Sequence, residues 1–110
     1  MTNIEALRTL CNAIANTFYP DDATLEFALF NEGVDATAAA TPKDATIFRV
    51  AVGLVRGYVE ASRTENGVST SVNTDALKNS LLYWCNVYGV DADEIIAEFV
   101  RVIDDASNLY

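Results

Sequence analysis

The sequence contains no histidine. Histidine is the usual general base near neutral pH and the commonest metal ligand, so its absence excludes the most frequent catalytic and metal-binding arrangements. Only two cysteines are present, Cys11 and Cys85, and neither has a second cysteine near it in the sequence. We expect two buried free thiols, or a disulfide only if the fold brings them together. No metal and no cofactor are predicted.

Other catalytic patterns are also missing. The adjacent acids at 21–22, 93–94 and 104–105 are poor acid/base pairs, because neighbours on a helix point about 100° apart. A calcium loop starting at residue 91 would need glycine at its sixth position, which is Ile96. The chain is therefore not expected to be an enzyme. A small carboxylate-dependent enzyme is the remaining catalytic alternative, and it would require a deep pocket lined by acids.

Positive charge is scarce. Seven Lys and Arg residues face 16 Asp and Glu residues, giving a formal charge of -9. Such a surface repels phosphate backbones, so sequence-specific nucleic-acid recognition is not expected, although nucleic acid could slide past without adhering. Because 51% of the residues are hydrophobic, the chain should fold rather than remain disordered.

No long apolar run is free of charge. The most apolar stretch, residues 45–61, contains Arg49 and Arg56, and each would cost about 2.5–3.5 kcal/mol at a bilayer centre. It predicts a buried helix, and no membrane association is expected. The first residues lack the basic start and apolar run of a signal peptide, so synthesis in the cytoplasm is expected. With 110 residues, the chain has the size of one domain, 1–110.

Caps and apolar spacing predict the first three helices. Thr2 and Glu5 form a capping-box pattern ahead of a helix over about residues 3–17. A short second helix follows the 20–22 break and ends at Gly33. A long third helix is predicted over about residues 42–63, with Thr41 as its N-cap and Pro42 at its first position, and is expected to be the backbone of the fold.

The second half of the chain predicts two more helices after a short β element. Residues 64–67 include Asn-Gly, which favours tight hairpin turns, and residues 68–72 alternate apolar and polar side chains. A fourth helix should begin at residue 73 or 74 and end at Gly89, and a fifth should follow Asp91. The predicted fold is mainly α: a five-helix bundle-like domain with a short β-hairpin or extended arm between its third and fourth helices.

Two charged features point to association. Arg49, Arg56 and Arg63 recur every seven residues on the third helix. They lie opposite its expected core face, which is formed by Ile47, Val50, Ala51, Leu54 and Tyr58. Between residues 91 and 110 there are six acidic residues and one arginine, so acid is concentrated in the last helix. Both could be plain solvated faces, the first partly satisfied by an Arg56–Glu60 pair. Alternatively, the basic stripe of one subunit meets the acidic helix of another.

The candidate interface residues are therefore those of the basic stripe, the arm and the acidic helix. They are Arg49, Arg56, Arg63, Val68, Thr70, Val72, Glu94, Glu98 and Asp105.

The order of elements resembles a known family. Short N-terminal helices, a long central helix, a Gly-containing turn with a β-like arm (65–72), then Asp75-Ala76-Leu77-Lys78 opening a helix that ends in Tyr88-Gly89-Val90, are similar to the head–tail connector, or adaptor, proteins of tailed phages and prophages. The likeness covers most of the chain and is a pattern of helices and a turn rather than a fixed signature.

The resemblance implies a homo-oligomeric ring at the virion head–tail interface. Its partners would be the portal protein and tail-side connector proteins, and DNA would pass through without specific binding. The basic stripe and the acidic helix would supply two different patches for ring contacts, and the arm could dock on a neighbour. The alternative is a small acidic regulator or DNA mimic that binds a basic host protein.

Overall fold

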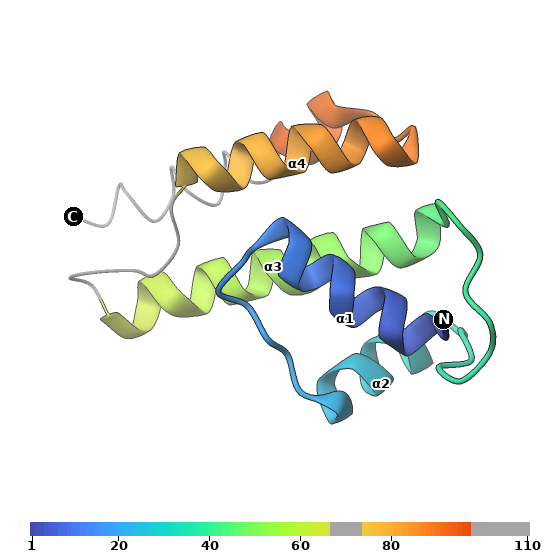
Figure 1. Cartoon of the computed structure of the whole chain (residues 1–110). Helices are drawn as coiled ribbons and strands as arrows, with labels where there is room; N and C mark the ends of the chain where they lie inside the picture. Colours follow the sequence, from blue (N-terminus) through green and yellow to red (C-terminus); the bar gives the residue numbers. More distant parts are fainter. Residues whose placement is uncertain (67–73, 98–110) are drawn as a thin grey trace.

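The computed structural model describes residues 1–66 and 74–97 and shows a mainly helical domain (Figure 1). This confirms the predicted fold class. The predicted hairpin or arm at 68–72 lies outside the described residues. A further helical segment begins at Ala92, after four helices: α1 Asn3–Ile14, α2 Asp22–Asn31, α3 Ala45–Asn66 and α4 Thr74–Tyr88.

Helix α1 lies at the centre of the fold. It contacts α2, α3 and α4, which surround it (Figure 1). Its residues Leu7 and Cys11 have no exposed surface, and Ile14 has almost none. The sequence predicted that the long third helix would be the backbone of the fold, and α3 is indeed the longest helix at 22 residues. The helix that touches all the others, however, is α1.

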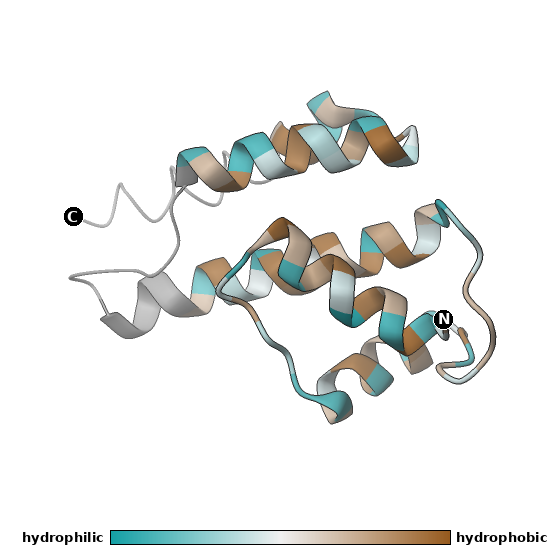
Figure 2. Ribbon diagram, in the orientation of Figure 1, coloured by the Kyte–Doolittle hydropathy of each residue, from teal (hydrophilic) through white to brown (hydrophobic). Residues whose placement is uncertain are grey.

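The core is formed mainly by aliphatic side chains from all four helices and the segment that begins at Ala92, together with Phe48 and the two cysteines. Helices α1 and α3 each carry apolar and hydrophilic residues on different sides (Figure 2), which suits helices with one buried face. Both cysteines are free and buried, as predicted. Burial raises the pKa of the Cys11 thiol to about 12, so that it stays neutral at physiological pH. No described helix is both long and apolar enough to span a bilayer.

Capping hydrogen bonds set the start of α1. The Glu5 N–H donates to Thr2 Oγ1 (3.3 Å), and the Thr2 N–H donates to Glu5 Oε1 (2.9 Å). This is the predicted capping box. The bond from the Thr2 N–H and a second one from the Thr2 hydroxyl (2.9 Å), both to Glu5 Oε1, hold the pKa of the Glu5 carboxyl below its usual value.

Helices α2 and α4 end where the sequence predicts, at glycines in the left-handed conformation. Gly33 has φ +70°, and the Val34 N–H donates to the Leu29 carbonyl (2.9 Å). Gly89 has φ +67°, and the Val90 N–H donates to the Cys85 carbonyl (3.0 Å). Both are Schellman caps, in which carbonyls left over at the helix end are satisfied.

Helix α1 ends earlier than predicted, at Ile14 rather than near residue 17. The following residues instead bind α3. The Thr17 hydroxyl and the Tyr58 hydroxyl lie 2.9 Å apart, and the Phe18 ring stacks on the Tyr58 ring with centroids 4.6 Å apart. Tertiary contacts thus replace the last predicted turn of the helix.

Helix α3 begins later than predicted, at Ala45 rather than at Pro42. Asp44 caps it, because its side chain accepts from the Thr46 N–H (2.9 Å) and its carbonyl accepts from the Phe48 N–H (3.1 Å). Lys43 has φ +58°, which is incompatible with a right-handed helix. Asp44 therefore takes the role predicted for Thr41.

Helix α3 also extends further than predicted, to Asn66. It includes three residues of the expected 64–67 turn. Asn-Gly favours tight hairpin turns, but glycine is also common just after the end of a helix. The dipeptide alone therefore does not tell whether the helix ends before it or runs up to its glycine.

The buried face of α3 differs from the predicted one. Ile47 and Ala51 are buried as expected, but Phe48, Val52, Val55 and Val59 are buried too, whereas the expected core residues Val50, Leu54 and Tyr58 are only partly covered. The face is turned by roughly 80°, counted at 3.6 residues per turn. The basic stripe consequently borders the core instead of lying opposite it.

Substitutions at two glycines can separate the effect of backbone conformation from the effect of steric crowding. An added Cβ would meet nothing within 4 Å at Gly57, inside α3, or at Gly33, after α2. Of these two glycines, only Gly33 has a positive φ. We expect Gly57→Ala to raise the free energy of unfolding by about 0.5–1 kcal/mol, since alanine favours helix. Gly33→Ala should lower it by about 1–2 kcal/mol, since a Cβ strains the left-handed conformation.

Urea unfolding followed by circular dichroism measures both changes. Gly53→Ala is the matched control for Gly57→Ala, because Gly53 is also helical with open space around its Cα. Equal effects at Gly57 and Gly33 would contradict the assignment of their backbone roles.

The Asp21 cap predicts a specific acid dependence. Asp21 Oδ1 accepts from the Thr24 N–H (2.8 Å). Hydrogen bonding with the side chain and then the backbone of Thr24 holds the pKa of the Asp21 carboxyl below its ordinary value of 3.8. A lowered pKa in the folded state means that the stabilisation is present above the ordinary value and is lost as the pH falls further. Asp21→Asn keeps an acceptor without a charge.

The wild type should therefore unfold at a higher temperature than Asp21→Asn at pH 7, by a margin that shrinks between about pH 5 and pH 2. Thermal unfolding in a pH series measures the margin. A margin independent of pH would show that the charge of Asp21 does not stabilise α2.

Candidate binding surface

An open groove runs along the exposed side of α2. It has a volume of about 550 Å³ and is lined by Ala23, Glu26, Phe27, Phe30, Val34, Ala36 and Thr37. Phe27 is 65% exposed and Phe30 is 76% exposed, which is unusual for large aromatic side chains. Exposed apolar surface of this kind commonly marks an interaction site.

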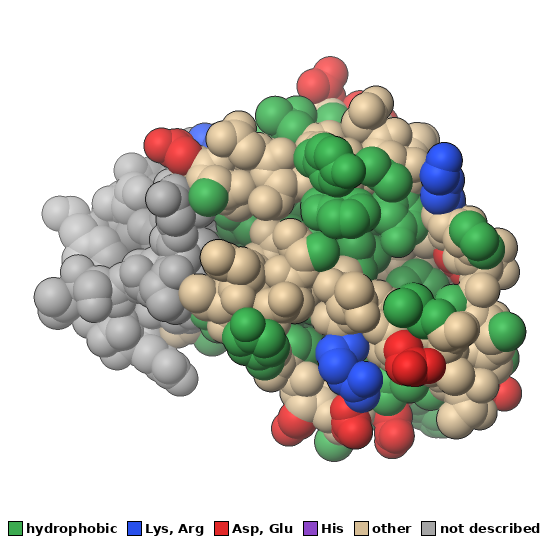
Figure 3. All heavy atoms as spheres, viewed as in Figure 1, with side chains coloured by type: hydrophobic (Ala, Val, Ile, Leu, Met, Phe, Trp, Pro, Cys, Tyr) green, Lys and Arg blue, Asp and Glu red, His purple; other side chains and the backbone are tan. Residues whose placement is uncertain are grey.

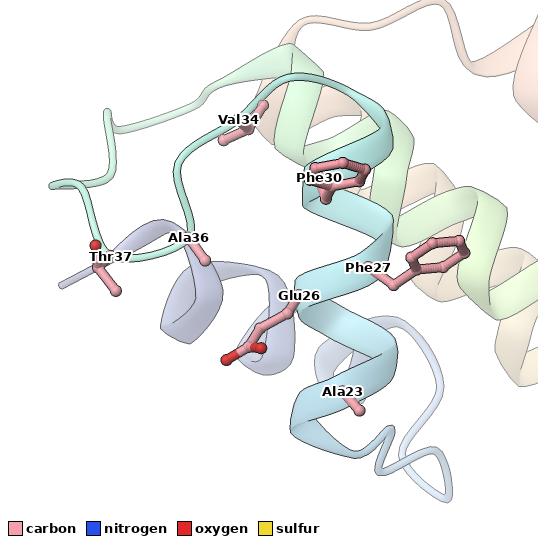
Figure 4. A pocket seen from close by; sticks show the side chains of 7 residues that line it. All are labelled: Ala23, Glu26, Phe27, Phe30, Val34, Ala36 and Thr37. Carbon is pink, nitrogen blue, oxygen red and sulfur yellow. The ribbon is translucent and has the colours of Figure 1, made fainter.

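The large apolar residues of α2 are not confined to one side of the helix, which explains why these rings face solvent. Leu25 and Leu29 are fully buried on the side that packs against α1. Phe27 and Phe30 lie on neighbouring turns of another side of the helix (Figure 4). α2 is thus apolar on two sides, only one of which the domain covers.

Residues 34–37 form the second wall of the groove, and the N-terminus of α1 holds them in place. The Ile4 N–H donates to the Ala36 carbonyl (3.0 Å), and the Asn3 N–H donates to the Ala38 carbonyl (2.9 Å). The buried Asn3 side chain also donates to the Asp35 carbonyl (2.9 Å). These bonds satisfy N–H groups that a helix start leaves without partners, and they make the wall part of the folded scaffold.

The groove has an acidic border. The Glu26 carboxylate projects from α2 on the side where Ala36 and Thr37 lie (Figure 4). Glu26 and the nearby Glu32 are both exposed. Asp35 Oδ1 accepts from the N–H (3.0 Å) and the hydroxyl (2.9 Å) of Thr37, which lowers the pKa of that carboxyl.

A second apolar surface lies on α4. Leu82 is 49% exposed and Tyr83 is 60% exposed. Tyr83 meets Trp84 edge-on with ring centroids 5.0 Å apart, and Trp84 in turn lies against Tyr88. Figure 3 shows hydrophobic side chains gathered over α4 and beside it on the face in view. Tyr88 stacks on the buried Phe48, so this surface is continuous with the core.

The structure brings part of the basic stripe and part of the acidic helix together within one chain. A small pocket of about 120 Å³ is lined by Arg49, Val52, Gly53, Arg56, Glu94 and Ile95. Arg49 and Arg56 of the basic stripe therefore already lie near Glu94 of the acidic helix inside the subunit. The buried Ile95 and Val52 side chains place them there, by packing the segment that begins at Ala92 beside α3.

The other predicted interface residues are not placed. Arg63 belongs to α3 by its backbone, and its side chain lies outside the described part of the chain. Val68, Thr70, Val72, Glu98 and Asp105 lie outside the described residues altogether. The described residues contain no group of three or more side chains that could hold a metal ion.

Sequence reasoning missed Phe27 and Phe30. The sequence carried a signal, because four large apolar residues of the ten in α2, two Leu and two Phe, cannot share one helix face. A helix with apolar residues on several sides is either buried all round or has a side left for a partner.

A protein-family model matches residues 1–110, the whole chain. The chain belongs to DUF6706, a family of unknown function. No curated protein and no solved structure matches the chain. The function of this DUF6706 member must therefore be argued from its surfaces.

The pocket between Arg56 and Glu94 predicts a charge effect within one subunit. Arg56→Glu should lower the free energy of unfolding by about 0.5–1 kcal/mol, because it removes a positive charge beside Glu94 and adds a negative one. Glu94→Arg in the same chain should recover part of this loss, which a double-mutant cycle in urea measures.

Lys78→Glu on α4 is the control, since it changes the net charge equally outside this pocket. The loss should not depend on protein concentration. A loss that appears only in concentrated samples would instead show that the stripe acts between subunits.

Proposed function

We propose that this DUF6706 protein is a non-catalytic assembly subunit of the head–tail connector type. In this role it forms a homo-oligomeric ring at the virion head–tail interface, between the portal protein and the tail-side connector proteins. The order of helices that resembles this family supports the proposal, as does the surface chemistry of α2 and α4.

The observation that carries the proposal is the presence of exposed apolar groups on two separate sides of the domain. α2 and α4 both pack on α1 and lie on opposite sides of it (Figure 1). Phe27 and Phe30 are exposed on α2, and Leu82 and Tyr83 on α4. A connector subunit contacts both neighbouring copies of itself and the next protein along, so it needs more than one contact surface, and exposed apolar groups commonly mark such surfaces.

We assign the contact between copies to the α4 surface. There, the exposed residues adjoin the Tyr83–Trp84–Tyr88 aromatic series, and aromatic residues are enriched in protein interfaces. Lys78 lies one turn before Leu82, so positive charge is available beside apolar surface on a chain of net charge -9. Such a contact reduces the repulsion between acidic copies.

The acidity fits a ring through which DNA passes. Each copy adds a charge of -9, so an assembled ring would carry a strongly negative lumen or rim. Phosphate backbones would be repelled rather than held, and DNA would move through with little adhesion.

The alternative is a small acidic regulator or DNA mimic that binds a basic host protein. The same net charge favours it. The two functions differ in assembly, because a mimic stays monomeric or dimeric and a connector forms rings.

Self-association through α4 gives the decisive measurement. Sedimentation velocity over a concentration series, with electron microscopy of the most concentrated samples, should show ring-sized oligomers of the wild type. Leu82→Ser with Tyr83→Ser should shift the midpoint of assembly to at least about tenfold higher concentration, because exposed apolar anchors contribute most of the contact energy.

Tyr19→Ser is the matched control, since Tyr19 is 77% exposed and lies outside α4. It should assemble like the wild type, and circular dichroism should show unchanged helix content in all variants. A wild type that stays monomeric or dimeric at every concentration, and also on isolated portal protein, would contradict the connector role.

A further inference from the structure

The groove on α2 has chemistry that differs from that of α4. Its apolar lining includes Phe27, Phe30 and Val34, and Glu26 is the only charged side chain among its lining residues. The charged residues in the surrounding sequence are also all acidic. Residues 9–42 contain five acidic residues and no Lys or Arg.

All five of these acids are exposed: Asp21, Asp22, Glu26, Glu32 and Asp35. The ion pair of Asp22 with Arg8 offsets one of them. Hydrogen bonds of Asp21 with the side chain and backbone of Thr24, and of Asp35 with the backbone and side chain of Thr37, lower the pKa of each carboxyl and so favour the charged forms. A negative potential therefore surrounds an apolar groove, and this combination selects for a ligand that is apolar in the middle and basic at its edges.

The groove is also held ready for a ligand. One wall is α2, fixed by an Asp cap at its start and a glycine cap at its end. The other wall, residues 34–37, is bonded to the start of α1 through Asn3 and Ile4. A preformed site avoids the entropy cost of ordering its walls on binding.

We infer that the α2 groove binds a basic amphipathic segment of a partner protein, whose apolar side chains contact Phe27 and Phe30 while its Lys or Arg residues face Glu26 and the neighbouring acids. This inference rests on the proposed function, in which α4 joins copies and α2 joins the next protein along. A second copy of this chain suits the groove less well, because each copy is itself strongly acidic.

A synthetic peptide tests the groove directly. The probe is an amphipathic helix of about 18 residues, with Leu on one face and Lys on the other, and its binding to the full chain is measured by calorimetry. The wild type should bind it, and Phe27→Ser with Phe30→Ser should weaken binding at least about tenfold without changing net charge. Because both rings are mostly exposed, this variant should keep its helix content.

Three comparisons separate the groove from general charge attraction. Glu26→Gln should weaken binding about two- to fivefold and reduce its dependence on salt. Tyr19→Ser removes an exposed aromatic residue outside the groove and should bind like the wild type. A peptide with Ser in place of Leu keeps every Lys and should bind at least about tenfold more weakly.

Equal binding of the peptide by the wild type and by Phe27→Ser with Phe30→Ser would overturn the inference, since charge alone would then explain binding. Loss of self-association in that variant, with no peptide present, would overturn it in favour of a second copy in the groove. Leu82→Ser with Tyr83→Ser should still bind the peptide. If ring assembly fails but the peptide still binds, the connector role is contradicted, whereas the inference about the α2 groove is supported.

Discussion

The packing of α1 against three other helices is the interaction on which the rest of the domain depends. Leu7 and Cys11 are completely buried on this helix, so removing it would expose the inner faces of α2, α3 and α4 together. α1 also acts through its backbone. Its first N–H groups bind the carbonyls of residues 36 and 38, so the same helix that fills the core holds one wall of the α2 groove.

The central position of α1 has a consequence at the surface. α2 and α4 pack on opposite sides of α1. Each therefore has one side buried against α1 and another side exposed. On both helices the exposed side carries large apolar residues, and the α2 side is bordered by carboxylates. Two surfaces of different chemistry on one small domain favour contact with two different neighbours, which is why an assembly role is preferred over a single-partner inhibitor.

The position of the basic stripe is where the structure differs most from the sequence prediction. A helical wheel placed the basic stripe of α3 opposite the core, free to meet an acidic neighbour. In the fold, Val52 is buried between Arg49 and Arg56, and these arginines line a pocket together with Glu94 of the same chain. The wheel was wrong because α3 packs against α1, against Tyr88 of α4 and against the segment that starts at Ala92, so its buried face is wider than one stripe and is turned toward these neighbours.

The sequence by itself determined where most helices begin and end. Thr2, Asp21, Gly33, Gly89 and Asp91 act through hydrogen bonds or backbone angles that involve only residues a few positions away, so local patterns suffice to find them. Only the tertiary structure decided which sides of α2, α3 and α4 are covered, and that residues 34–37 complete a groove. It also decided that α1 ends at Ile14, because the residues that follow it contact Tyr58. Those outcomes depend on contacts between segments far apart in the chain, and the periodicity of one helix carries no information about which neighbours will cover it.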